Sequence, residues 1–168
     1  MTKTLFATAA AVVVSAALSG CMSLSRSSAV TPMAAGEANH LKVTEIKLTV
    51  SDAVKVSPKF DGIFREHVQA KLDKCLAGDR PVRLEAKVDR LDKSNAVMTA
   101  IVAGANVLRG SARLVDVGSG AVVADYQVGQ TVVGRSVAVV VMAKAEEQLS
   151  DGFGDELCRQ AFPSATTK

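Results

Sequence analysis

The chain of 168 residues carries 20 Lys or Arg against 17 Asp or Glu, which gives a net charge of +3. It contains one Tyr and no Trp, and its basic residues form no run. This composition argues against an aromatic and basic platform for nucleic acid. The length suits one small domain with a single hydrophobic core.

The first twenty residues have the pattern of an export signal. Lys3 provides a short positive start, and residues 5–18 are uncharged and mostly apolar. An apolar run of about 14 residues is too short to span a bilayer as a helix, so we favour a signal peptide over a transmembrane anchor. The apolar run ends in Leu18-Ser19-Gly20-Cys21.

The sequence Leu18-Ser19-Gly20-Cys21 resembles the lipobox of bacterial lipoproteins. The resemblance implies that residues 1–20 are removed and that Cys21, the new first residue, is acylated and holds the chain on a membrane. Each buried methylene of the acyl chains contributes about 0.8 kcal/mol. Met22 in place of an acidic residue favours, by resemblance to enterobacterial lipoproteins, the outer membrane facing the periplasm. An ordinary secretory signal with an incidental cysteine is the alternative.

The next segment, residues 21–40, reads as a flexible tether. It is rich in Ser and Ala and shows little periodicity. A flexible segment of this length spans roughly 25 Å on average. We therefore expect a single domain over residues 41–162, followed by a polar tail over residues 163–168.

Alternating and helical periodicities predict the first half of this domain. Residues 46–50 alternate as a half-buried strand, and Ser57 is a reasonable N-cap for a helix that ends near Cys75. Residues 82–89 alternate more cleanly, with a charged outer face. Its carboxylates at Glu85 and Asp89 lie about 13 Å apart along a strand, too far to act as a catalytic pair.

Residues 96–108 are nearly all apolar and small, with Ala96, Ala100 and Gly104 repeating every four residues. On a helix this repeat would form a stripe for close packing, for self-association or for membrane contact. A buried strand is the other interpretation, because several residues are β-branched. If residues 96–108 pack on the apolar face of the sheet, they are part of the core and need have no separate function.

The last third of the chain predicts a hairpin and a helix. Residues 111–117 and 121–128 flank Gly118-Ser119-Gly120, whose glycines suit a tight turn. Residues 137–162 show a helical stripe, and we expect a kink where Gly152 and Gly154 interrupt it.

Cysteine counting supplies a long-range restraint. With Cys21 assigned to lipid, Cys75 and Cys158 remain as an even pair in an exported protein. Each lies near the end of a predicted helix, so a disulfide forms if both helices run the same way on one sheet face. In the entropic model such a bridge contributes on the order of 4 kcal/mol. Free buried thiols and a metal site are the alternatives, although the two histidines provide too few ligands for a metal.

These elements predict an α+β domain in which a mixed or antiparallel sheet of about four strands carries two main helices on one face. The domain is similar to periplasmic lipoproteins with the fold of the TolB amino-terminal domain and of the curli-assembly lipoprotein. The residues that carry this likeness are Gly104, Gly110, Leu114-Val115-Asp116, Gly120 and Val122-Val123. The likeness implies a fold and assigns no functional residue.

No nucleophile elbow or metal-ligand cluster is evident, so we expect no enzyme, no catalytic residue and no cofactor. The favoured function is a lipid-anchored accessory or assembly subunit of an envelope complex, with an unidentified envelope protein as partner. The alternatives are a subunit that forms homo-oligomers in an outer-membrane export or pore complex, and a carrier of lipid or another small ligand.

Overall fold

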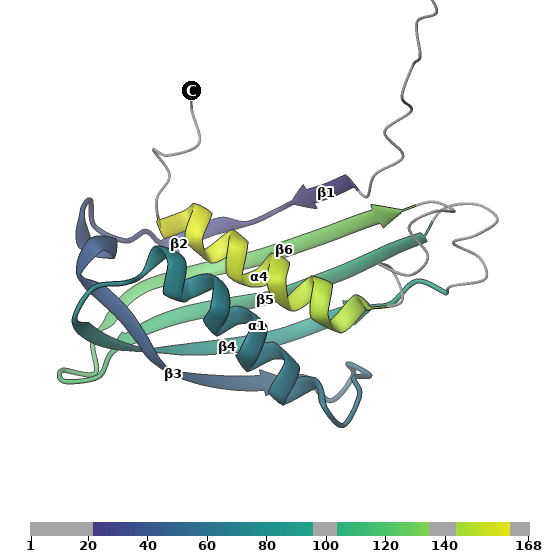
Figure 1. Ribbon diagram of the computed structural model, residues 1–168, viewed down its shortest axis with the longest axis horizontal. Coiled ribbons are helices and arrows are strands. Elements are labelled where there is room, and N and C mark those ends of the chain that lie inside the picture. Colours follow the sequence, from purple (N-terminus) through teal and green to yellow (C-terminus); the bar gives the residue numbers. More distant parts are fainter. Residues whose placement is uncertain (1–21, 96–103, 135–143, 162–168) are drawn as a thin grey trace, which may run out of the picture.

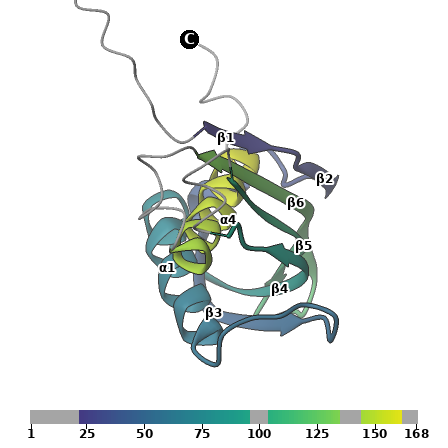
Figure 2. The ribbon, with the colours of Figure 1, turned by 90° about the vertical axis from the view of Figure 1, so that its right-hand side faces the viewer.

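The computed structural model describes residues 22–95, 104–134 and 144–161. Six strands form one mixed sheet, and two long helices cover one of its faces (Figures 1 and 2). The elements are β1 (Met22–Ser25), β2 (Ser28–Thr31), the 3-10 helix η1 (Glu37–His40), β3 (Leu41–Val50), α1 (Phe60–Cys75), β4 (Arg80–Asp92), β5 (Gly104–Asp116), β6 (Val122–Gly134) and α4 (Ala145–Ala161). The expected α+β class is confirmed, whereas the expected number of about four strands is too low.

The sheet has the strand order β1-β6-β5-β4-β3, and β2 also pairs with β6. Only β3 and β4 run parallel; the other pairs are antiparallel. Parallel neighbours need a long crossover, and α1 provides it between β3 and β4. The sheet is therefore mixed, which is one of the two arrangements that the sequence allowed.

The residues between the predicted signal and β3 differ from expectation. In place of a flexible tether over residues 21–40, residues 22–25 and 28–31 pair with β6 and residues 37–40 form η1. Both strands are short and exposed along their whole length. A strand that buries neither face has no alternation of apolar and polar residues, so the sequence pattern does not reveal it. The folded domain thus begins near residue 22.

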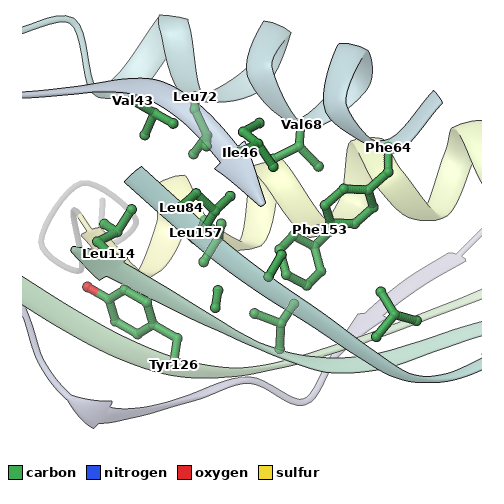
Figure 3. Close-up of a cluster of buried hydrophobic side chains, with 14 of the residues drawn as sticks. Val43, Ile46, Phe64, Val68, Leu72, Leu84, Leu114, Tyr126, Phe153 and Leu157 are labelled. Atoms are coloured by element: carbon green, nitrogen blue, oxygen red, sulfur yellow. The ribbon is translucent and has the colours of Figure 1, made fainter. Parts of the chain in front are cut away.

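Alternation is clear in the central strands because only one face of the sheet is covered. The covered face carries the buried residues of β4, β5 and β6, which pack under the two helices (Figure 3). The opposite face, here called the open face, carries charged and polar side chains. The predicted alternation of residues 82–89 is confirmed by the burial pattern of β4.

Helix α1 begins at Phe60 and buries the stripe Phe60, Phe64, Val68 and Leu72. The expected N-cap at Ser57 is wrong. Its hydroxyl instead donates to the Glu146 carboxylate of α4, 2.5 Å away. The cap position is held by Lys59, which makes no side-chain capping bond. The Ser57 hydroxyl therefore bonds to a carboxylate that is distant in sequence, and it does not cap the helix as the local sequence predicts.

Helix α4 runs without interruption from Ala145 to Ala161 and includes Gly152 and Gly154. A methyl group added to Gly154 would lie 2.7 Å from the Cβ of Lys71 on α1, closer than packed carbons allow. Next to it, the ring of Phe153 packs edge-on against Phe64, with centroids 5.0 Å apart. Gly152 and Gly154 have low helix propensity, but the absence of their side chains allows α4 to lie close to β6 and α1.

The predicted hairpin is confirmed. Strands β5 and β6 pair along their lengths, and Gly120 in the connecting turn has a φ of 72°, which favours glycine. The carboxylate of Asp116 accepts hydrogen bonds from the backbone and the hydroxyl of Ser119, both 2.7 Å long. Arg80 and Ser119 together hold the pKa of Asp116 far below its usual value.

Candidate functional site

Strand β1 starts at the residue directly after Cys21. Met22 lies opposite Val133 of β6, and Ser25 lies opposite Gln130. Cys21 itself, the predicted lipidation site, is outside the described residues. An acyl group on Cys21 would therefore be joined to a strand of the sheet without an intervening tether.

Side chains add to the backbone pairing of this edge. Gln130 donates to the hydroxyl of Ser23, and Arg159 of α4 donates to the hydroxyl of Ser25 at 3.2 Å. The hydroxyl of Ser27 accepts the backbone N–H of Gly129 at 3.0 Å. The N-terminal edge is thus bonded both to β6 and to the last turns of α4.

The carboxylate behind this edge is Glu156, which is only 4% exposed. Burial raises its pKa, but hydrogen bonds from Arg159, from the serines of the N-terminal edge and from Gln160 lower it, and the net pKa lies below its usual value. Glu156 therefore stays ionised and keeps Arg159 in place beside Ser25.

At the end of the sheet where Met22 lies, the open face carries several apolar side chains. Met22 and Leu24 are 58% and 46% exposed, which is high for large apolar side chains. Met22 lies opposite Val133, which lies opposite Ala105; Leu24 is in the next row, which also contains Val107. We call these five residues the apolar strip. Residues directly opposite in antiparallel strands share a face, so Met22, Val133 and Ala105 form a continuous apolar row, and Thr131 lies between Leu24 and Val107 in the next row.

The predicted interaction segment is only partly described. Ala96 and Ala100 lie outside the described residues, as do residues 137–143 of the helix expected over residues 137–162. Gly104 is buried and begins β5, opposite Gly134 of β6. For residues 104–108 the structure therefore shows the strand, and not the helical stripe of small residues.

The two cysteines beyond Cys21 are joined. Cys75 and Cys158 form a disulfide with their Cα atoms 5.7 Å apart. Helices α1 and α4 run in the same direction on one face of the sheet (Figure 1), which brings their C-terminal ends together. This is the pairing and the helix arrangement that cysteine counting predicted.

Farther from Met22, the open face carries charges in regular order. Lys47, Glu85, Arg113 and Asp125 lie opposite one another across β3, β4, β5 and β6. They line a shallow groove of about 340 Å³ together with Thr49, Ala86, Lys87 and Ser111. We call these four charged residues the charge ladder. Its arginine pairs with Asp125 at 3.2 Å.

A buried carboxylate connects three elements at the start of α4. Glu146 is 9% exposed and accepts hydrogen bonds from the backbone N–H of Ser57 at 2.8 Å and from the Lys93 ammonium at 2.9 Å. Burial raises its pKa, but Ser57 and Lys93 lower it, and the net pKa is below normal. The sequence analysis missed this residue, since a lone Glu near a helix start carries no motif.

Residues 22–95, 104–134 and 144–161 provide no support for a metal site or for a helix that crosses a membrane. No group of three or more His, Cys, Asp or Glu side chains there is placed to hold a metal ion. None of the helices in these ranges has both the length and the hydropathy to span a membrane. Glu85 and Asp89, rejected above as a catalytic pair, bind Arg83 and Lys87 at 2.8 and 2.7 Å.

Comparisons with known proteins found no matching family model and no matching curated protein. Several solved structures show some likeness. A PelC dodecamer from Paraburkholderia phytofirmans is 16% identical, with 79% of this chain and 98% of that chain covered and a TM-score of 0.38. A putative lipoprotein from Caulobacter crescentus is 14% identical, with 73% and 92% covered and a TM-score of 0.44.

A DUF330 protein from Xanthomonas campestris is 14% identical, with 82% of this chain and 95% of that chain covered and a TM-score of 0.43. Likeness at this level says nothing about what this chain binds.

Proposed function

We propose that the protein is a lipid-anchored, periplasm-facing lipoprotein of the outer membrane that acts as a non-enzymatic accessory or assembly subunit of an envelope complex. The observation that carries the proposal is the pairing of β1 with β6 directly after Cys21. Acyl chains on Cys21 would hold the folded domain close to the membrane and in a restricted orientation. A subunit that must present one surface to a neighbouring protein needs such an orientation.

The open face supplies that surface. Helices cover the other face of the sheet, but the charge ladder remains accessible across four strands. Its charges alternate in sign, as they do on surfaces that select a partner by electrostatic complementarity. Its acids are paired with neighbouring cations, an arrangement that suits recognition better than proton transfer.

Crosslinking in intact cells tests the proposal. The wild type is compared with Cys21→Ser, which lacks the anchor, and with a Lys47→Glu and Lys87→Glu double variant, which keeps the anchor but reverses charge in the groove. We expect the wild type to capture a defined set of envelope proteins that both variants lose. The double variant must remain in the membrane fraction. Capture of the same set by Cys21→Ser would contradict the proposal.

A second candidate is a subunit that associates with copies of itself. The two edges of the sheet differ: at β3, Arg65 donates to the carbonyl of Ile46, and Gln69 donates to that of Val43 at 3.0 Å. At the other edge, β1 and β2 are exposed throughout. An uncovered edge can pair with another strand. In mild detergent, a particle many times the 17.4 kDa of one chain would favour this candidate.

The space that a ligand carrier would need lies between the helices and the sheet. Phe64, Val68, Phe153 and Leu157 occupy this space (Figure 3). The structure thus offers no observation in favour of the carrier hypothesis.

A further inference from the structure

The apolar strip ends at a row of arginines on the open face. Arg109 of β5 lies opposite Arg90 of β4 and opposite Gly129 of β6. Between β1 and β2, the backbone N–H of Arg26 donates to the carbonyl of Gly129, 2.7 Å away. Arg26 is two residues from Leu24, so it shares the face of Leu24. We call Arg26, Arg90 and Arg109 the arginine row.

Gly129 leaves room for the middle arginine to lean across β6. A methyl group added to Gly129 would lie 2.6 Å from the Arg26 carbonyl oxygen and 3.1 Å from Nη1 of Arg109. The Arg109 guanidinium donates to the carbonyl of Gln130 at 3.2 Å and to the hydroxyl of Thr131 at 3.3 Å. Thr131 is in the row of Leu24, so Arg109 points toward the apolar strip.

Two of these guanidinium groups have no acidic partner. Within residues 22–95, 104–134 and 144–161, Arg26 and Arg109 form no ion pair, whereas Arg90 binds Asp92 at 2.5 Å. The arginine of the charge ladder, Arg113, differs because it binds Asp125. Arg26 and Arg109 therefore place unbalanced positive charge on the open face beside the apolar strip.

We propose, building on the proposed function, that the apolar strip lies against the membrane and that the arginine row binds the phosphates of anionic phospholipid headgroups. Cys21 directly precedes Met22, so its acyl chains would enter the bilayer at the strip. Successive rows on one face are about 6.8 Å apart along an antiparallel strand. Apolar surfaces of interfacial proteins enter the bilayer by about 5 to 10 Å, which leaves the next row at the depth of the phosphates. Arginine matches phosphate in geometry and charge.

The charge content of two further stretches of the chain is compatible with an anionic membrane as the partner. Residues 96–103 contain no charged residue, and residues 135–143 contain a single one, Arg135. These stretches add no carboxylate, and Asp92, which lies opposite Val107 of the apolar strip, is paired with Arg90.

A tryptophan reporter tests the orientation, because the chain has no Trp of its own. Leu24→Trp is placed in the full acylated protein, and Val122→Trp at the far end of the sheet is the matched control, since the two native side chains are 46% and 47% exposed. Both proteins are reconstituted into vesicles of phosphatidylethanolamine and phosphatidylglycerol with brominated acyl chains. We expect emission from residue 24 to fall about twofold and to shift to the blue, with no change at residue 122.

The outcomes separate the orientation from the anchoring. Unquenched emission from residue 24 in protein that still floats with the vesicles would overturn the orientation and leave the lipid anchor intact. Equal quenching at both positions would overturn it as well. Acylated protein that fails to float with vesicles would instead contradict the proposed function.

A charge variant tests the arginine row. Replacing phosphatidylglycerol by neutral phosphatidylcholine is expected to reduce the quenching at residue 24 about twofold. Arg26→Gln should abolish this dependence on anionic lipid, whereas Arg113→Gln, on the same face but far from the anchor, should preserve it. If Arg26→Gln keeps the full dependence, the arginine row does not bind the headgroups.

Discussion

Two contact regions join distant parts of this chain and differ in their chemistry. We call the contact between α1 and α4 the helix seam and the pairing of β1 with β6 the strand seam. Between α1 and α4, buried rings and a disulfide join residues more than eighty positions apart. Between β1 and β6, the contacts are backbone pairs and serine hydroxyls on strands that are exposed throughout. The helix seam buries aromatic rings at its centre and carries the Lys71–Asp155 ion pair at its surface, whereas β1 in the strand seam is exposed along its whole length.

The difference predicts where stability lies. Burial of apolar surface is the dominant favourable term in folding, whereas a solvent-exposed hydrogen bond contributes little beyond its exchange with water. The helix seam should therefore set the global stability. The strand seam should open locally, at low cost, while the rest of the domain stays folded. Among the described residues, the segment that follows Cys21 is thus expected to be the least stable.

The largest effect is expected from the centre of the helix seam. Phe153 is fully buried between α1 and the sheet, so Phe153→Ala should lower the free energy of unfolding by about 4 kcal/mol. Urea unfolding followed by circular dichroism measures the change. An effect below about 1 kcal/mol would show that the seam is not the main source of stability.

Removal of the disulfide comes next. The bridge closes a loop between positions 83 residues apart. The Cys75→Ala and Cys158→Ala double variant should lose about 3 to 4 kcal/mol, because its unfolded chain regains conformational freedom. Thermal unfolding of the oxidised wild type, the reduced wild type and the double variant provides the comparison. The reduced wild type and the double variant should unfold at similar temperatures.

The start of the helix seam should respond to acid. The pKa of Glu146 is below its usual value in the folded protein, so its stabilisation is complete above about pH 4.5 and is lost as the pH falls further. Glu146→Gln should be less stable than wild type by about 2 kcal/mol at pH 7, with the gap narrowing below pH 4.5. Unfolding curves at several pH values test this, and a gap independent of pH would contradict it.

The smallest effect belongs to the strand seam. Ser23→Ala removes a hydroxyl that accepts a hydrogen bond from Gln130, and it should lower global stability by less than about 1 kcal/mol. Amide hydrogen exchange in residues 22–25 should nevertheless quicken several-fold. Ser28→Ala on the neighbouring exposed strand is the control and should leave exchange at residues 22–25 unchanged. If Ser23→Ala lowered global stability as much as Phe153→Ala, the two seams would not differ in their contribution to stability.

Much of the central fold follows from sequence periodicity. The clean alternation in residues 82–89 predicted β4 because one face of the sheet is dry and the other is wet. The apolar stripe from Phe60 to Leu72 predicted α1 for the same reason at the helical period. Both patterns reflect burial on one side of an element, which is what a sequence records most directly.

The exposed and the long-range features could not be predicted in this way. Strands β1 and β2 bury neither face, so their sequences resemble a linker. Ser57 suits a helix cap by local rules, but the fold brings the Glu146 carboxylate to it from 89 positions away. Local propensity cannot anticipate a partner that only folding supplies.

By itself, the sequence determined the α+β class and the pairing of Cys75 with Cys158, because these depend on burial period and on cysteine count; it also predicts an export signal and a lipobox from composition and spacing. Tertiary structure alone decided that the chain after Cys21 joins the sheet edge. It also decided that the apolar strip adjoins the arginine row, since this depends on the register of β1, β5 and β6. Register between distant strands is fixed by hydrogen bonding and packing across the whole sheet, and no local pattern contains it.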